Sequence, residues 1–156
     1  MQDFLQLQYG LVQASRAVLL QYTATMQQQH FTRSSPAFGR GSVRNLLVHI
    51  CDTYHYWIAD RVLQLEPAFP PFDAYDTLDQ CRDYFEKTDQ LMTLFLERFA
   101  GQYTNPLPVQ RQQGIDMLSP LTLFTHVITH EFHHKGQILS LSRDLGYTPV
   151  DTDVIR

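Results

Sequence analysis

The sequence predicts an all-α protein that folds as an antiparallel four-helix bundle, with residues 1–156 forming a single domain. Four long segments repeat their apolar residues every three to four positions, which is the spacing of amphipathic helices. Most of the connections between these segments are short, as in an antiparallel bundle. No credible set of strands with period-two alternation is present. The length allows one real hydrophobic core and is short for two.

The first two helices are predicted in the N-terminal part of the chain. Apolar residues recur at helical spacing from about Phe4 to Met26. The stretch HFTRSSPAFGRG follows and is rich in Ser, Gly and Pro, so we expect a loop there. Ser42 is a good N-cap for a second helix that continues to about Leu65. This helix is apolar nearly all round, which predicts a central and well-covered position.

Proline, glycine and serine mark the limits of the last two helices. Three prolines in EPAFPPFD end the second helix, and a third begins near Asp76 or Thr77 and stops at Gly101. The long connection over 101–118 exceeds a tight turn and has room for a short hairpin or a lid. The pair Ser119-Pro120 starts the fourth helix, which runs to about Leu145 before Gly146.

Composition excludes several classes of protein. The net charge is −4 and no basic cluster is present, which disfavours nucleic acid as a partner. No apolar run approaches the ~20 residues that span a membrane, and the N-terminus lacks the features of a secretory signal. Cys51 and Cys81 are too few for a disulfide scaffold. We therefore expect a cytoplasmic protein with two reduced, buried cysteines and no membrane contact.

Four of the seven histidines fall on the fourth predicted helix. At 100° per residue, His134 lies about 70° and His130 about 110° from the mean direction of the apolar residues, whereas His126 and His133 point to solvent. His130 and His134 are thus an i, i+4 pair that can hold one metal ion from a single helix face. The alternative is a pair of histidines hydrogen-bonded at the edge of a packed helix.

His49 is the candidate for a third ligand, because it stands on the second helix among apolar residues and has little access to solvent. A neutral buried imidazole needs partners for both nitrogens, and a metal supplies one of them. A structural core histidine is the alternative interpretation. His55 lies well around the helix from His49, and His30 falls in the predicted loop, so both are weaker candidates.

The letters HEFHH, from His130 to His134, also match the H-E-x-x-H signature of zinc proteases. That function requires Glu131 as a general base and a further ligand downstream. None of the 22 residues after His134 is a histidine. Gln137 and Ser140 stand where one extended form of the signature has a glycine and a histidine. A peptidase is therefore disfavoured.

The segments HEFHHKGQILSLSRDLGYTP and RNLLVHICDTYHYW together resemble the DinB/YfiT-like family of metal-binding four-helix bundles, and the resemblance covers the whole chain. It implies a three-histidine metal site formed by His49, His130 and His134. Lys135 replaces an arginine that is frequent in the family, which keeps the charge. Glu131 occupies a position that is often small in relatives, and its role stays open.

The resemblance implies a divalent metal ion, with zinc or nickel expected first and iron or manganese as alternatives. It also implies a metal-dependent thiol S-transferase that uses a low-molecular-weight thiol such as bacillithiol or mycothiol, a small-molecule substrate and a homodimer. A metal-dependent hydrolase is a close variant, with Glu131 as base or as a buried carboxylate. The alternative is a non-catalytic metal- or ligand-binding bundle of the stress-response type. Three residues near His49 either support the metal ligands or make ordinary packing contacts: Asp52, Thr53 and Tyr56.

Overall fold

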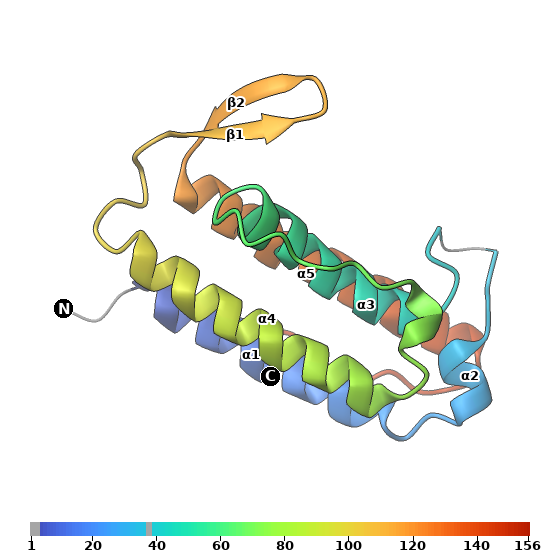
Figure 1. The fold of residues 1–156 in the computed structure, drawn as a ribbon. Helices are drawn as coiled ribbons and strands as arrows, with labels where there is room; N and C mark the ends of the chain where they lie inside the picture. Colours follow the sequence, from blue (N-terminus) through green and yellow to red (C-terminus); the bar gives the residue numbers. More distant parts are fainter. Residues whose placement is uncertain (1–3, 37–38) are drawn as a thin grey trace.

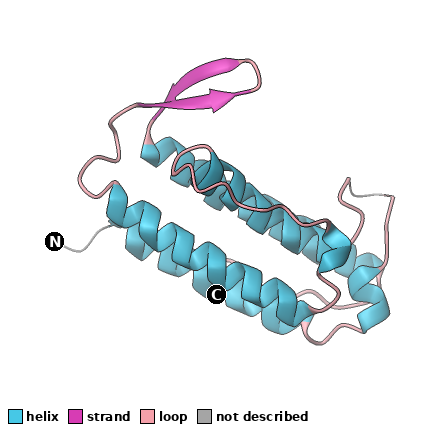
Figure 2. Cartoon of the chain, in the orientation of Figure 1, coloured by secondary structure: helices cyan, strands magenta, loops and turns pink. Residues whose placement is uncertain are grey.

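A computed structural model describes residues 4–36 and 39–156 of the chain and confirms the predicted four-helix bundle (Figure 1). Helices account for most of the described chain, and one small hairpin lies at an end of the bundle (Figure 2). The four long helices are α1 (Phe4–Thr23), α3 (Val43–Tyr54), α4 (Leu78–Arg98) and α5 (Pro120–Asp144).

These helices form two antiparallel pairs, α1 beside α4 and α3 beside α5 (Figure 1). Helix α3 also packs against α4, which joins the two pairs, so its predicted central position is confirmed. The pairing brings the middle of α5 against α3. The contact between α3 and α5 positions His49, His130 and His134.

Side-chain caps set where three of the long helices begin. The N–H of Asn45 donates to Oγ of Ser42 at 3.1 Å, and the N–H of Thr122 donates to Oγ of Ser119 at 3.1 Å. Thr77 and Gln80 form a reciprocal capping box at the start of α4. Because a cap fixes the first helical residue, it also fixes which face each later side chain occupies.

The predicted second helix ends earlier than Leu65. After Tyr54 the backbone widens into a π-helix, η1 (His55–Asp60), in which the N–H of Arg61 donates to the carbonyl of Tyr56. Gln64 and Glu66 then have φ angles of 54° and 48°. These values belong to the left-handed region and stop a right-handed helix. The first helix likewise ends at Thr23, slightly before the predicted Met26.

Two short helices interrupt segments that were expected to be loops. Helix α2 (Gln28–Thr32) includes the start of the predicted loop, and its Phe31 is buried against the core. The loop prediction was therefore wrong for residues 30–32, and residues 37–38 of the same stretch lie outside the described residues. A 3-10 helix, η2 (Phe72–Ala74), follows the prolines that precede α4.

The connection between α4 and α5 contains a two-stranded antiparallel hairpin, β1 (Leu107–Arg111) and β2 (Gly114–Leu118). The suggestion of a short hairpin here is confirmed, although no set of strands with period-two alternation is evident in the sequence. Val109 is fully buried and anchors the hairpin to the bundle. Pro108 can stand in β1 because each strand of a two-stranded sheet has a free edge.

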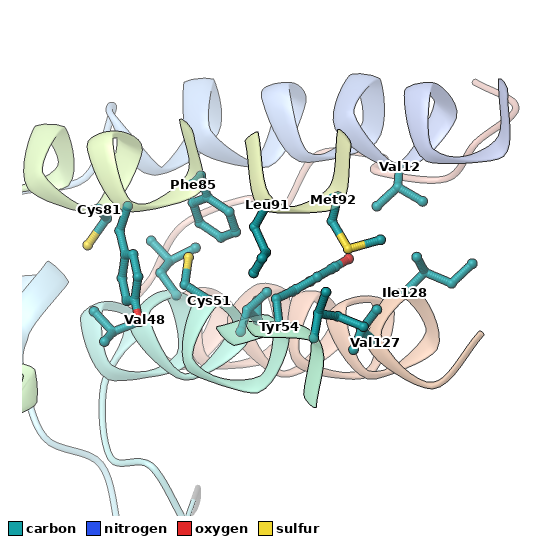
Figure 3. Close-up of a cluster of buried hydrophobic side chains, with 14 of the residues drawn as sticks. Val12, Val48, Cys51, Tyr54, Cys81, Phe85, Leu91, Met92, Val127 and Ile128 are labelled. Carbon is teal, nitrogen blue, oxygen red and sulfur yellow. The ribbon is translucent and has the colours of Figure 1, made fainter. Parts of the chain in front are cut away.

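The core fills the space between the α1–α4 and α3–α5 pairs (Figure 3). Cys51 and Cys81 are both free and buried within it, as predicted. Side chains from four helices meet there, among them Val12, Val48, Tyr54, Phe85, Leu91, Met92, Val127 and Ile128.

The segment after α5 returns along the bundle to α1. Nζ of Lys135 donates a hydrogen bond to Oγ of Ser15, which in turn donates to the carbonyl of Thr152. A guanidinium N–H of Arg156 reaches the carbonyl of Ala14 at 3.2 Å. Within residues 4–36 and 39–156, none of the helices combines the length and apolar character that crossing a membrane requires.

Candidate metal centre

The three histidines singled out in the sequence come together in the structure. His49 projects from α3, and His130 and His134 project from successive turns of α5. The centroid of the His49 ring lies 5.0 Å from that of His130 and 4.7 Å from that of His134. The ring centroids of His130 and His134 are 4.3 Å apart. Imidazoles from two helices therefore meet at one point.

The nitrogen atoms of this cluster are spaced for a common ion. One ring nitrogen from each histidine lies within 4.8 Å of the other two. Nε2 of His130 and Nε2 of His134 are 3.1 Å apart. Two nitrogens on a tetrahedral zinc ion, each at about 2.0–2.1 Å, are separated by roughly 3.3 Å. The spacing between His130 and His134 thus fits two imidazoles on one divalent ion, and the His49 nitrogen, within 4.8 Å of both, is placed to join them.

The surroundings keep the three imidazoles neutral. Burial, followed by the nearby charge of Arg40, lowers the pKa of His49 to about 3. Burial, followed by the proximity of His134, lowers the pKa of His130 to about 4. Burial also lowers the pKa of His134. Since only a neutral imidazole has a lone pair to donate, this environment matches what a metal ion requires of its ligands.

One side chain outside the cluster orients the candidate ligand His134. Nδ1 of His134 lies 2.7 Å from Oε1 of Gln137, and Nε2 of Gln137 lies 3.1 Å from Nε2 of His133. An amide oxygen only accepts, so Nδ1 of His134 carries the proton and Nε2 keeps its lone pair. Such a partner on the distal nitrogen is typical of metal-ligating histidines. This role of Gln137 was not predicted, although its position three residues after His134 places both side chains on the same side of the helix.

The remaining histidines lie where the sequence placed them, with one exception. His126 and His133 are exposed, as predicted. His55 packs against the ring of Tyr84, away from the cluster. His30 belongs to α2 instead of a loop, and its Nδ1 lies 2.9 Å from the hydroxyl of Tyr147.

Glu131 points into the core of the bundle and is fully buried. Its Oε1 accepts from Nε of Arg16 at 3.0 Å. Its Oε2 accepts from Nη2 of Arg16 at 2.9 Å and from the hydroxyl of Tyr54 at 2.7 Å. Of the two roles that the sequence left open, the structure therefore shows the buried, hydrogen-bonded carboxylate.

Arg16 is the other half of this buried network and was not predicted from the sequence. Besides Glu131, it contacts Asp89 of α4, with 2.6 Å between Nη1 and Oδ1. A signal was present, because Arg16 interrupts the apolar face of α1, four residues after Val12 and three before Leu19. A charged residue on an apolar face indicates a buried partner.

The three residues considered for an outer shell make other contacts. Asp52 accepts a hydrogen bond from the hydroxyl of Tyr84 at 2.9 Å, and burial raises its pKa. The hydroxyl of Thr53 bonds to the backbone carbonyl of His49 at 2.9 Å within α3. The ring of Tyr56 stands edge-to-face against that of Trp57. Their described contacts are those of helix packing, apart from the backbone link from Thr53 to His49.

Comparison with known proteins places the chain among DinB proteins. The model of the DinB family matches residues 1–156. A crystal structure of a DinB-like protein from Bacillus subtilis has the same fold, with a TM-score of 0.63 and 18% sequence identity. That match covers 91% of this chain and 95% of the other.

Two curated proteins of Bacillus subtilis (strain 168) are also similar in sequence. Protein DinB is 30% identical over 77 residues, which is 49% of this chain and 44% of that protein. The chain therefore matches less than half the length of this relative. The uncharacterized protein YizA is 28% identical over 120 residues, or 74% of each chain.

Proposed function

The chain belongs to the DinB family, and we propose that it binds a divalent metal ion through His49, His130 and His134 and acts as a metal-dependent enzyme. The observation that carries this proposal is the convergence of three imidazoles, with one nitrogen of each within 4.8 Å of the others. Zinc and nickel are the proposed ions, because both accept imidazole ligands readily; iron and manganese are less favoured.

The proposed reaction is the transfer of a low-molecular-weight thiol, such as bacillithiol or mycothiol, to a small electrophile. A divalent ion with three neutral ligands keeps its full charge and supplies Lewis-acid chemistry that favours deprotonation of a thiol or a water molecule. The chain itself holds the ligands neutral by burial and orients His134 through Gln137. Three protein ligands also leave coordination positions for a reactant.

A hydrolase is the close variant of this proposal, with water in the place of the thiol. Glu131 does not serve as its general base, because both carboxylate oxygens are engaged by buried donors. The exposed side chain of His133 lies beside the site, with 4.9 Å between its ring centroid and that of His134.

A thiol-conjugation assay distinguishes an enzyme from a non-catalytic binding bundle. Protein loaded with zinc or nickel is mixed with bacillithiol or mycothiol and the electrophile monochlorobimane, and the fluorescent conjugate is followed. We expect a rate above the uncatalysed background that is lost in the variant His49→Ala. If the loaded protein neither forms conjugate nor hydrolyses a panel of esters and amides, the enzyme proposal fails.

A homodimer also stays a prediction. Phe4, Leu7 and Leu11 are exposed at successive turns of α1, where a second copy could cover them. Light scattering coupled to size-exclusion chromatography gives the mass directly. A monomeric mass over the accessible concentration range would refute this prediction.

A further inference from the structure

A pocket of about 290 Å³ lies between η1 and the hairpin. One wall is formed by Tyr56 and Trp57 of η1. The other is formed by Arg111, Asp116 and the turn over 112–114 that joins β1 to β2. This volume is near the lower end of the range for small-molecule sites. The π-helix that presents the aromatic wall is a rare element that often occurs at functional sites.

The pocket is connected to the candidate metal centre through side-chain contacts. The ring of Trp57 stands edge-to-face against that of His126, with 5.2 Å between their centroids. His126 in turn lies 5.9 Å from His130, again measured between centroids. Trp57 thus lines the pocket and also contacts His126, which lies next to the proposed ligand His130.

The lining of the pocket combines an aromatic surface with a cation. The guanidinium carbon of Arg111 lies 5.6 Å from the centroid of the Trp57 ring. Its Nη1 pairs with Oδ2 of Asp116 at 2.7 Å, and both side chains are about half exposed. The opposite charges of Arg111 and Asp116 offset each other in this ion pair. It engages Nη1, and a guanidinium carries five N–H donors in a planar fork that suits a carboxylate.

We propose that this pocket binds the planar, carboxylate-bearing part of a small-molecule substrate, with its plane against Trp57 and its carboxylate on Arg111. That the bound molecule is a substrate rests on the proposed function, because the adjacent three-histidine centre would supply the chemistry. Binding itself depends only on the pocket, so it can be measured on the metal-free protein. Its failure is therefore distinguishable from failure of the metal proposal.

Trp57 is the only tryptophan of the chain, so intrinsic fluorescence reports directly on the pocket. Benzoate serves as the probe, and benzamide is its uncharged counterpart. We expect a saturable change of Trp57 emission with benzoate and a weaker response to benzamide. The variant Arg111→Gln should weaken benzoate binding about ten- to a hundredfold, which is the usual effect of losing a hydrogen bond to a charged group. Its response to benzamide should not change.

Two further variants separate direct contact from general charge effects. Arg61→Gln removes the same charge from an arginine that lies over Tyr56 and pairs with Asp60, and it should leave benzoate binding within twofold of the wild type. Asp116→Asn frees Arg111 from its partner and should tighten benzoate binding. The proposal is overturned if benzoate gives no saturable response, if both arginine variants lose affinity equally, or if Asp116→Asn weakens binding. An unchanged melting temperature in each variant establishes that the fold is intact.

Discussion

Nδ1 of His134 donates a hydrogen bond to the amide oxygen of Gln137 over 2.7 Å, which leaves Nε2 of His134 facing Nε2 of His130. One helix therefore carries two of the proposed ligands and also the group that orients one of them. The spacing explains how, since residues three and four apart lie on the same side of a helix.

Replacing Gln137 with Ala should weaken zinc binding about ten- to a hundredfold, because the ring of His134 loses the partner that fixes its orientation and proton position. Competition against a chromogenic chelator measures this affinity. The matched control is Gln90→Ala on the exposed side of α4, which should bind zinc like the wild type. Equal affinities of the Gln137 and Gln90 variants would show that the hydrogen bond has no effect on the site.

Replacing Glu131 with Ala should destabilise the fold and leave zinc stoichiometry unchanged. The substitution removes one of the two carboxylates that pair with the buried guanidinium of Arg16. Breaking a buried ion pair costs about 3–5 kcal/mol, and we expect the lower end of that range because Asp89 remains. Urea unfolding of the metal-free protein gives the free energy of unfolding.

The control for this measurement is Glu97→Ala, at an exposed position of α4, which should change stability by no more than about 0.5 kcal/mol. A loss below about 1 kcal/mol in the Glu131 variant would contradict a structural role for this carboxylate.

The metal-free protein should lose stability as the pH falls from about 6.5 toward 4. The folded state holds the pKa of His49 at about 3 and that of His130 at about 4, whereas the unfolded chain has the ordinary value of 6.5. In this window the unfolded chain binds more protons, so lower pH favours unfolding. Urea unfolding at pH 7 and at pH 5 measures the difference. The loss of unfolding free energy between pH 7 and pH 5 should be smaller in the variant His49→Ala. A loss as large as that of the wild type would contradict the low pKa of His49.

Much of the fold was predictable because local chemistry and the global fold agree. Three helices begin at capping residues that can be recognised in the sequence, namely Ser42, Thr77 and the pair Ser119-Pro120. Those starts, with helical periodicity, indicated which side of α5 carries His130 and His134. The convergence with His49 was not derivable from periodicity alone, because it depends on how α3 packs against α5. The family resemblance supplied that step.

The features that were missed depend on contacts between distant segments. The widening of the backbone at η1 has no distinct composition, since HYWIAD suits an ordinary helix equally well. The hairpin, by contrast, was expected as one of two alternatives, and its strands are too short for a clear pattern; the burial of Val109 against the bundle holds it in place. Arg16 was overlooked because its partners, Glu131 and Asp89, lie far away in the sequence.

The central claim is that imidazoles from α3 and α5 bind one ion together, and elemental analysis of purified variants tests it most directly. After loading with zinc and desalting, the wild type should retain one ion per chain. The variant His49→Ala should retain far less. The variant His126→Ala, which changes an exposed histidine on the same helix as His130 and His134, should keep the full amount. Full zinc occupancy in the His49 variant would contradict the account.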